Sequence, residues 1–120
     1  MKLQEEKIND VLIVRLEDPR LDSAISSEVK TELLRLMDRQ ELRNILLDLS
    51  MVEYADSSGL GALLFGHRHA ASKDGRLKLL HVNTKVLTLI KIAKLENILE
   101  WYHDEEEALA SFDEMNDKEN

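Results

Sequence analysis

Hydrophobic positions along this chain switch between two spacings, one typical of strands and one typical of helices. Strand-like segments, rich in β-branched or consecutive apolar residues, are predicted at 3–8, 11–16, 45–49, 77–82 and 98–102. Helix-like segments place apolar residues three or four positions apart, at 29–37, 60–71, 86–93 and 108–112. Strands that alternate with helices favour right-handed crossovers and parallel pairing. The sequence therefore predicts a single α/β domain with a mixed, mainly parallel sheet and about four helices packed on it.

The ends and the centre of the predicted sheet carry local signals. Asn9 and Asp10 tolerate the backbone of a tight turn, so the first two strands are expected to form an N-terminal β-hairpin. The segment 45–49 is apolar without alternation except for Asp48, which is typical of a strand covered on both faces. Residues 98–102 are expected to be a short edge strand. Residues 1–112 should form the domain, and the polar, acidic residues 113–120 a frayed tail.

Short polar side chains precede the predicted helices, where they are expected to act as caps. Ser26 or Ser27 is the expected cap of the first helix, and Asn83 or Thr84 that of the third. Asp104 precedes the last helix with an acidic residue three positions later, as in a capping box. In the second helix the residues expected to be buried are Leu60, Leu63, Leu64 and Ala71.

Composition and charge exclude several classes of function. The 120 residues include 43% hydrophobic and 33% charged side chains, as expected of a globular domain. The formal net charge of −8 argues against a nucleic-acid surface, which needs clustered Lys and Arg. The absence of cysteine excludes a disulfide framework, a thiolate metal site and a cysteine nucleophile. No apolar run approaches the ~20 residues of a membrane span, and the charged N-terminus is unlike a signal peptide, so a cytoplasmic location is expected.

The run DSSGLG at positions 56–61 is the strongest functional signal in the chain. It connects the apolar segment 45–49 to a helical segment, so hydroxyl groups and glycines gather at the start of a helix. The unpaired N–H groups and the dipole of a helix make its N-terminus suitable for a phosphate. The two serines are therefore either helix caps or the place where a phosphate is attached.

Other glycine and serine patterns do not indicate an enzyme. Gly59, Gly61 and Gly66 do not make a dinucleotide fingerprint, because Leu64 stands where the third glycine is needed. No Gly-Lys-Ser/Thr follows, which excludes a P-loop. The nucleophile elbow of serine hydrolases requires a glycine two positions before the serine, and neither serine of the doublet has one.

The remaining polar residues do not indicate a metal or cofactor either. His67 and His69 lie two positions apart on a predicted helix, so they point in nearly opposite directions and cannot chelate one ion. Neither a metal site nor a cofactor is expected. Asp48, near the C-terminal end of a parallel strand, is either a functional carboxylate or a turn partner for the loop at 50–56.

Two glycines of the run at 56–61 have a separate interpretation. Either Gly59 and Gly61 let a partner's backbone approach the first helical turn closely, or Gly59 adopts a positive φ in the loop. Neither is needed for helix propensity, since glycine costs ~1 kcal/mol against alanine in a helix.

The run at 56–61, together with the preceding segment 47–50, resembles the signature of the STAS domains of bacterial anti-sigma factor antagonists. The resemblance covers nearly the whole chain, since other segments also fall where that family places their counterparts. It implies a single STAS-like α/β domain that binds other proteins and is not an enzyme. It also implies a partner-binding surface made of Asp22, Ser23, Asp56, Ser57, Ser58, Gly59, Leu60 and Gly61.

In the family that the chain resembles, the second serine of the doublet is phosphorylated by a partner that is both anti-sigma factor and serine kinase. This serine corresponds to Ser58, and Ser57 is the less favoured position. The resemblance implies that the unmodified form binds this partner and frees the sigma factor, and that a PP2C-type phosphatase restores that form. Contacts with nucleic acid or membrane are not expected, and the chain should be a monomer or weak dimer.

Two other functions remain as alternatives. One is a constitutive scaffold subunit of a larger STAS assembly, in which Ser58 only caps the helix. A more distant one is an enzyme that uses Ser58 as its nucleophile.

The chain departs from the family at two places. Family members usually have glycine before the acidic or polar residue that precedes the Leu-Asp pair, whereas this chain has Asp18, Pro19 and Arg20 in that loop. Ala55 stands where a larger apolar residue is common. Because that loop lies beside the serine loop in the family's fold, the first difference bears on which partner is bound.

Overall fold

The computed structural model describes residues 1–39 and 42–118, with side chains up to residue 113. Among these residues the main sheet has five strands in the order β1-β2-β4-β6-β7, and two further strands, β3 and β5, pair separately. The strands are β1 (Leu3–Ile8), β2 (Val11–Leu16), β3 (Arg20–Leu21), β4 (Asn44–Asp48), β5 (Tyr54–Ala55), β6 (Arg76–Leu80) and β7 (Trp101–Tyr102). The helices are α1 (Ser26–Met37), α2 (Ser57–Ser72), α3 (Thr84–Ile92) and α4 (Glu105–Lys118).

The pairing of the main sheet is mixed and mostly parallel, as the sequence predicts. Strands β1 and β2 form the antiparallel N-terminal hairpin, and Asn9 in its turn has a φ of 54°. The pairs β2–β4, β4–β6 and β6–β7 are all parallel. The predicted edge strand is confirmed as β7, which contains only two residues.

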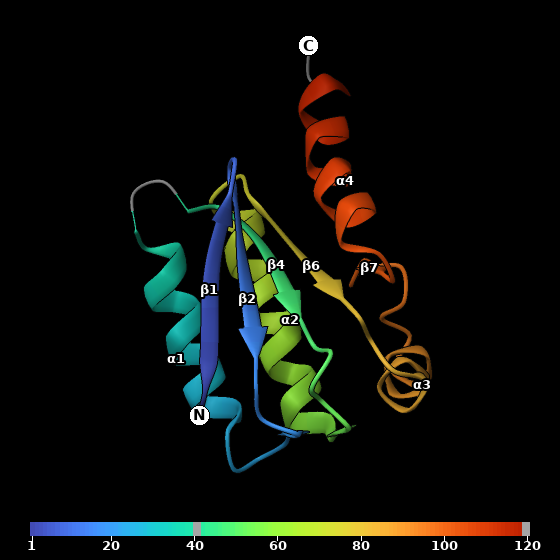
Figure 1. Cartoon of the computed structure of the whole chain (residues 1–120). Coiled ribbons are helices and arrows are strands. Elements are labelled where there is room, and N and C mark those ends of the chain that lie inside the picture. Colours follow the sequence, from blue (N-terminus) through green and yellow to red (C-terminus); the bar gives the residue numbers. More distant parts are fainter. Residues whose placement is uncertain (40–41, 119–120) are drawn as a thin grey trace.

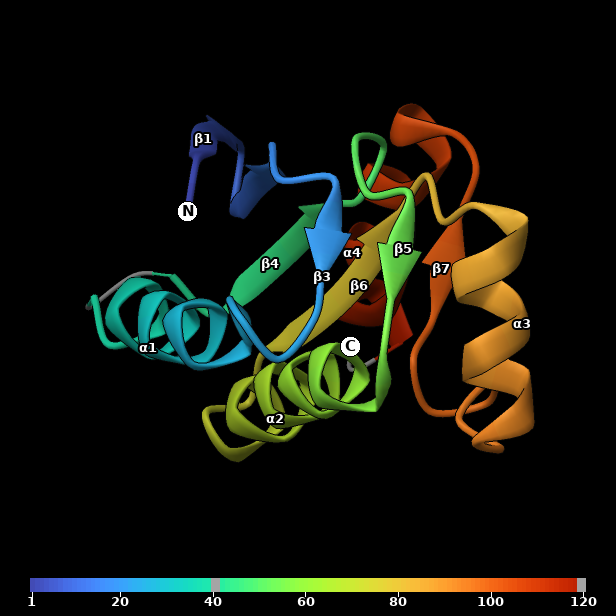
Figure 2. The same ribbon diagram turned by 90° about the horizontal axis from the view of Figure 1, so that it is seen from below.

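Helices cover both faces of the main sheet (Figures 1 and 2). Helices α1 and α2 lie side by side on one face, α4 lies on the other, and α3 stands beyond the β7 edge. The larger hydrophobic core lies between the sheet and α1, α2 and α3. A smaller second core, which includes Ile13, Leu46 and Phe112, lies under α4. Within the described part of the chain, no helix combines the length and the apolar character needed to cross a membrane.

Strand β4 is the centre of the sheet and is covered on both faces, as its unbroken apolar run predicts. Ile45 and Leu47 point into the larger core, whereas Leu46 points into the smaller one. All three are at most 2% exposed. The loop that follows β4 leads through β5 to the serine doublet, so the central strand of the sheet anchors that loop.

Lys78 is a buried lysine that helps to attach α4 to the sheet. Its Nζ donates to Ser111 Oγ at 2.8 Å and lies 3.3 Å from a carboxylate oxygen of Glu100. The same ammonium group lies 4.7 Å from the ring centroid of Phe112 and 5.6 Å from that of Tyr102. Ion pairing, hydrogen bonding and aromatic faces together offset the cost of burying this charge.

Several details of the predicted elements are wrong. The cap of α1 is Ile25, without a side-chain hydrogen bond, and Ser26 is instead the buried first residue of the helix. In α2, Ala70 is buried in place of Ala71, and Leu64 is only half-buried. Strand β6 ends at Leu80, because the next residue adopts a φ of 57° and turns the chain away.

Two helix ends agree with the sequence. Asn83 caps α3 by accepting from the Val86 amide at 2.9 Å, and Asp104 accepts from the Glu107 amide at 2.9 Å at the start of α4. The sequence predicts a frayed tail at 113–120, of which 119–120 lie outside the described residues. The backbone of 113–118 is helical and continues α4 to Lys118.

Candidate functional site

The short strands β3 and β5 bring the loop before α1 and the loop before α2 together at one end of the molecule (Figure 2). Arg20 pairs with Tyr54, and Leu21 pairs with Ala55, in parallel register. The carbonyl of Pro19 extends this pairing by accepting from the Tyr54 amide at 3.2 Å. The loop in which the chain departs from the family that it resembles therefore contacts the segment that leads to the serines.

Asp56 joins the two loops through both oxygens of its side chain. Oδ1 accepts from the Gly59 amide at 2.9 Å and thereby caps α2. Oδ2 accepts from the Ser23 amide at 3.2 Å, across the gap between the loops. The Asp56 amide donates to the Leu21 carbonyl at 3.2 Å. One aspartate thus fixes the start of α2 against the Ser23 loop.

Ser57 and Ser58 are the first two residues of α2, with Ser57 exposed and Ser58 half-buried. Neither hydroxyl has a hydrogen-bond partner within the described part of the chain, because Asp56 supplies the cap. The interpretation of the serines as caps is therefore wrong. Amides at the start of a helix lack intrahelical acceptors, so this position retains the character of an anion site next to two unbonded hydroxyls.

Gly59 and Leu60 do not face solvent, whereas Gly61 does. A Cβ atom added to Gly59 would lie 2.0 Å from the carbonyl oxygen of Leu21, so glycine allows α2 to approach β3. A Cβ atom added to Gly61 meets nothing within 4 Å. Neither has a positive φ. The first glycine therefore serves the packing of the domain, which differs from both interpretations that the sequence suggests.

Arg20 and Asp22 form an ion pair at the rim of the site. Arg20 Nε donates to Asp22 Oδ2 at 2.9 Å, and the guanidinium carbon lies 4.7 Å from the centroid of the Tyr54 ring. The hydrogen bond from Arg20 holds the pKa of Asp22 below its ordinary value, and the pKa of Arg20 is raised in return. The other oxygen of Asp22 accepts from the Ala24 amide at 3.0 Å and shapes the loop before α1.

Asn83 supports the serine loop from the side of α3. Its Nδ2 donates to the carbonyls of Val52 at 2.9 Å and Glu53 at 3.3 Å, while its Oδ1 caps α3. The segment before the serines is therefore held on one side by β3 and on the other by α3. Both supports come from parts of the chain about 30 residues away.

Asp48 belongs to a different cluster, on the α4 side of the sheet. Its Oδ1 accepts from the Ser50 amide at 2.9 Å, so its interpretation as a turn partner is confirmed. Its Oδ2 accepts from Arg15 Nη1 at 2.8 Å. Arg15 also binds Glu6 at 2.8 Å and Glu105 at 3.0 Å, so one guanidinium joins the hairpin, the central strand and α4. This buried carboxylate therefore has a structural role.

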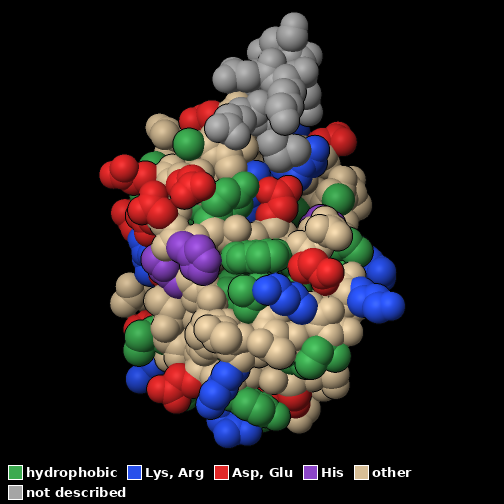
Figure 3. Space-filling model, turned by 90° about the vertical axis from the view of Figure 1, so that its right-hand side faces the viewer, with side chains coloured by type: hydrophobic (Ala, Val, Ile, Leu, Met, Phe, Trp, Pro, Cys, Tyr) green, Lys and Arg blue, Asp and Glu red, His purple; other side chains and the backbone are tan. Residues whose placement is uncertain are grey.

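The described part of the chain contains no group of three or more His, Asp or Glu side chains arranged to hold a metal ion. His69 instead stacks on Phe65 of the same helix, with ring centroids 6.0 Å apart. On the face that Figure 3 shows, acidic, basic and hydrophobic side chains of the described residues are interspersed. That face lacks the continuous basic area of a nucleic-acid-binding protein.

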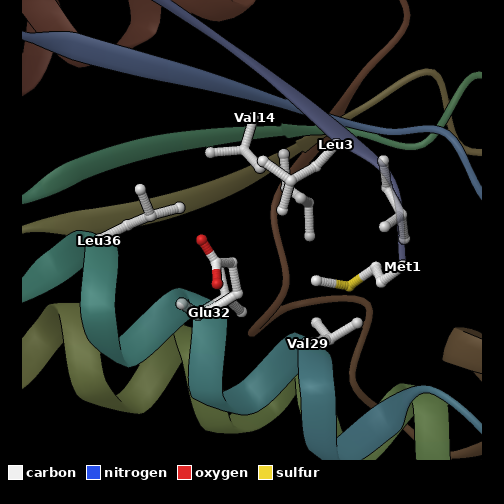
Figure 4. A pocket seen from close by; sticks show the side chains of 9 residues that line it. Met1, Leu3, Val14, Val29, Glu32 and Leu36 are labelled. Carbon is white, nitrogen blue, oxygen red and sulfur yellow. The ribbon is translucent and has the colours of Figure 1, made fainter.

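A small pocket between the hairpin and α1 is an alternative place for a ligand (Figure 4). Its lining is apolar except for Glu32, which already forms an ion pair with Arg35. Small-molecule sites combine an apolar lining with several convergent polar groups. One paired carboxylate does not meet that condition. The apolar lining comes from Met1, Leu3, Val14, Leu16, Val29, Leu33, Leu36 and Leu47.

The structure brings together all the site residues that the sequence predicts, at the junction of β3, β5 and α2. Of these, Ser23, Ser57 and Gly61 are exposed, and Asp22, Asp56 and Ser58 are half-buried. Sequence reasoning missed the contact of Tyr54 with Arg20 and the supporting role of Asn83. A polar residue just before a helical segment predicts Asn83 as a cap, but no local pattern indicates that its side-chain amide also reaches the loop before the serines.

Comparison with known proteins agrees with this architecture. Residues 2–108 match the family model of the STAS domain. The chain is 30% identical over 113 residues to the anti-sigma F factor antagonist of Paenibacillus polymyxa, covering 94% of this chain and 96% of the relative.

Solved structures show the same fold. An anti-sigma-factor antagonist (STAS) domain protein from Planctomyces limnophilus has a TM-score of 0.82 at 19% identity, covering 92% of this chain and 97% of that one. The Bacillus cell fate determinant SpoIIAA in its phosphorylated form has a TM-score of 0.69 at 21% identity, covering 92% of this chain and 98% of that one.

The matched residues include every strand of the described part of the chain, the first three helices and the start of α4. The relatives are named as antagonists of anti-sigma factors, and STAS proteins of this kind are binding proteins, not enzymes. The chain belongs to the STAS domain family and is a binding domain similar to the anti-sigma factor antagonists.

Proposed function

We propose that this chain is an anti-sigma factor antagonist whose binding is switched by phosphorylation. The unmodified form binds an anti-sigma factor that is also a serine kinase, which frees a sigma factor and so regulates transcription in the cytoplasm. Phosphorylation of Ser58 ends the binding, and a PP2C-type phosphatase restores it. The main observation in favour is the serine doublet at the start of α2. Among the described residues its hydroxyls have no hydrogen-bond partner, and the helical turn that carries them is fixed by the Asp56 cap.

The surroundings of the serines suit a protein partner. Met51 and Tyr54, in the segment before the doublet, are 58% and 44% exposed, which is high for large hydrophobic side chains. Exposed aromatic and arginine side chains are common energetic centres of interfaces, and Arg20 lies against Tyr54. A partner seated on these residues would also cover Ser57 and Ser58.

A phosphate at this position would act on the interface more than on the fold. It adds about −1.5 to −2 charges to a surface that already carries Asp22 and Asp56. Unfavourable charge contacts in an interface cost several kcal/mol, which corresponds to a hundredfold or more in affinity. Phosphorylation can therefore switch binding off without unfolding the domain.

Relatives supply further support. The name of the Paenibacillus relative states that it antagonises an anti-sigma factor, and SpoIIAA has been solved in both unphosphorylated and phosphorylated forms. Exposure alone favours Ser57 as the modified residue, whereas the family resemblance assigns the modification to Ser58.

The test combines phosphorylation and binding in one set of variants. The chain is incubated with ATP and the anti-sigma factor kinase from the same organism, and the modified serine is located by mass spectrometry. We expect Ser58→Ala to bind but resist modification, Ser58→Asp to bind about a hundredfold more weakly, and Ser57→Ala to behave nearly as the unaltered chain. If Ser58→Asp binds as tightly as the unaltered chain, the interface does not cover this serine.

That last outcome would favour the alternative, a constitutive STAS scaffold subunit without serine phosphorylation. The structure weakens one part of this alternative, since Asp56 and not Ser58 caps α2. An esterase assay on the purified chain tests the more distant hypothesis of a serine nucleophile.

A further inference from the structure

Arg20 is an isolated positive charge on the strand that pairs with the segment before the serine doublet. It is the only Lys or Arg in residues 16–29 and 44–66, which include both loops of the site. Its guanidinium lies over the Tyr54 ring and is bonded to Asp22 through Nε alone. The two terminal nitrogens of the fork have no hydrogen bond to any described residue. Arg20 therefore has unused donors at an exposed position.

The strand pairing places Arg20 next to the segment that leads to α2. Arg20 pairs with Tyr54, two residues before Asp56, and its guanidinium lies over the Tyr54 ring. The carboxylate of Asp56 is near enough to contribute to the raised pKa of Arg20. Asp56 in turn caps the helical turn that carries Ser58. The arginine is thus bonded to one carboxylate, that of Asp22, and lies within electrostatic range of a second, that of Asp56, which caps that turn.

On the basis of the proposed function, we propose that Arg20 is the counter-ion of a phosphate on Ser58. In the phosphorylated chain its guanidinium turns toward the phosphate and binds it through the terminal nitrogens, and this turn breaks the Nε hydrogen bond to Asp22. A phosphate offers three acceptor oxygens and up to two negative charges, and it suits the two-pronged geometry of arginine better than one carboxylate oxygen does.

This exchange changes more than the charge of the partner surface. Asp22 loses its ion pair, and the stacking of Arg20 on Tyr54 is lost with it. A partner protein then contacts a changed loop around Asp22 and the exposed ring of Tyr54 as well as the phosphate. Arg20 thereby links modification of α2 to the shape of the loop before α1.

The test uses the full chain with phosphoserine installed at position 58 during synthesis, so it does not depend on any kinase. The second ionisation of the phosphate, near pH 6 in free phosphoserine, is followed by phosphorus NMR. We expect its pKa to be about half a unit lower with Arg20 than in the Arg20→Gln variant, a threefold difference in proton affinity. Other charged or titratable groups around the site are the same in these two proteins: Asp22, Glu53, Tyr54, Asp56, His81 and Lys85.

Lys85→Gln is the matched control, since it removes one positive charge from the first turn of α3, which packs against β5. It should leave the phosphate pKa unchanged. An equal shift in both variants would show an effect of net charge and overturn the proposal, as would equal pKa values with and without Arg20.

A second measurement needs no variant. The Nε–H resonance of Arg20 should move when Ser58 carries phosphate, and an unmoved resonance would contradict the exchange. If the kinase fails to modify Ser58 while these results hold, the proposed function fails and the role of Arg20 stands.

Discussion

Gly59 and Gly61 occupy the same helical turn, yet an added methyl group meets different surroundings at the two positions. At Gly59 it would collide with the Leu21 carbonyl oxygen, whereas at Gly61 it would meet solvent. We expect Gly59→Ala to lower the free energy of unfolding by about 2 to 3 kcal/mol, because α2 must shift away from β3. Gly61→Ala should be neutral or raise it by up to ~1 kcal/mol, since alanine favours the helix.

Urea denaturation of the two variants checks this contrast, and binding to the anti-sigma factor is measured alongside. Lower stability with unchanged affinity at Gly59→Ala would show that this glycine serves the backbone and not the partner. Equal stability of the two variants would contradict the close approach of α2 to β3.

The ion pair of Asp22 predicts a dependence of stability on pH. The folded pKa of this carboxyl group lies below its ordinary value of 3.8, chiefly because of the hydrogen bond from Arg20. Such a group stabilises the fold above its unfolded pKa, and the stabilisation is lost as the pH falls through the lower folded pKa. We therefore expect Asp22→Asn to be less stable than the unaltered chain at pH 7 and the difference to shrink below about pH 3.8.

Denaturation curves at several pH values between 7 and 2 measure this difference. Asparagine is the appropriate replacement, because its side-chain oxygen can still accept from the Ala24 amide. A difference that stays constant with pH would mean that the charge of Asp22 contributes nothing.

At the scale of elements, Asn83 has two separable roles, as cap of α3 and as support for the serine loop. Serine caps helices about as well as asparagine but is too short to reach the Val52 carbonyl. We expect Asn83→Ser to cost about 1 kcal/mol through the lost hydrogen bonds and Asn83→Ala to cost about 1 kcal/mol more through the lost cap. Thermal melts give the two costs.

Amide hydrogen exchange separates the two roles further. Asn83→Ser should speed exchange in residues 52–56 while α3 keeps its protection. If residues 52–56 exchange at the same rate in Asn83→Ser as in the unaltered chain, the support is unimportant.

The periodicity of apolar residues was sufficient to predict a strand or helix where that element is long enough to show a period. The four longer strands of the main sheet and all four helices follow from apolar spacing, and the centre of the sheet follows from the unbroken run at β4. Strand β7 is predicted only as part of the longer segment 98–102. Strands β3 and β5 could not be found this way, because two residues show no period and their pairing depends on distant backbone.

The helix caps predicted wrongly from the sequence also depend on hydrogen bonds that no local pattern shows. Ser26 looks like a cap, but the carbonyl of Asp22 already accepts from the Ile25 and Ser26 amides and turns the chain into α1. The serines at the start of α2 were ambiguous in the sequence because Asp56, Ser57 and Ser58 are all good caps. Only the structure shows which side chain reaches the Gly59 amide.

At the scale of the whole molecule, a negative charge on Ser58 should leave the fold intact. The dipole and free amides of a helix N-terminus favour an anion by about 0.3 to 1 kcal/mol. We expect Ser58→Asp to melt within a few degrees of the unaltered chain, and the matched variant Ser58→Lys to melt lower. A cooperative transition lost in Ser58→Asp would show that the half-buried position cannot accept charge, and the switch would then act by unfolding.

The hairpin strand β1 has a consequence for how the molecules behave at high concentration. It is the outer strand of the main sheet, so one row of its backbone groups has no neighbouring strand. Such an edge invites other chains to add strands and form aggregates. Here the middle of the strand, Gln4 to Lys7, is polar, exposed and mostly charged, and the opposite edge, β7, is only two residues long. Both edges of the main sheet are therefore poor templates for added strands, so the exposed Met51 and Tyr54 of the proposed partner surface are not accompanied by an aggregation-prone sheet edge.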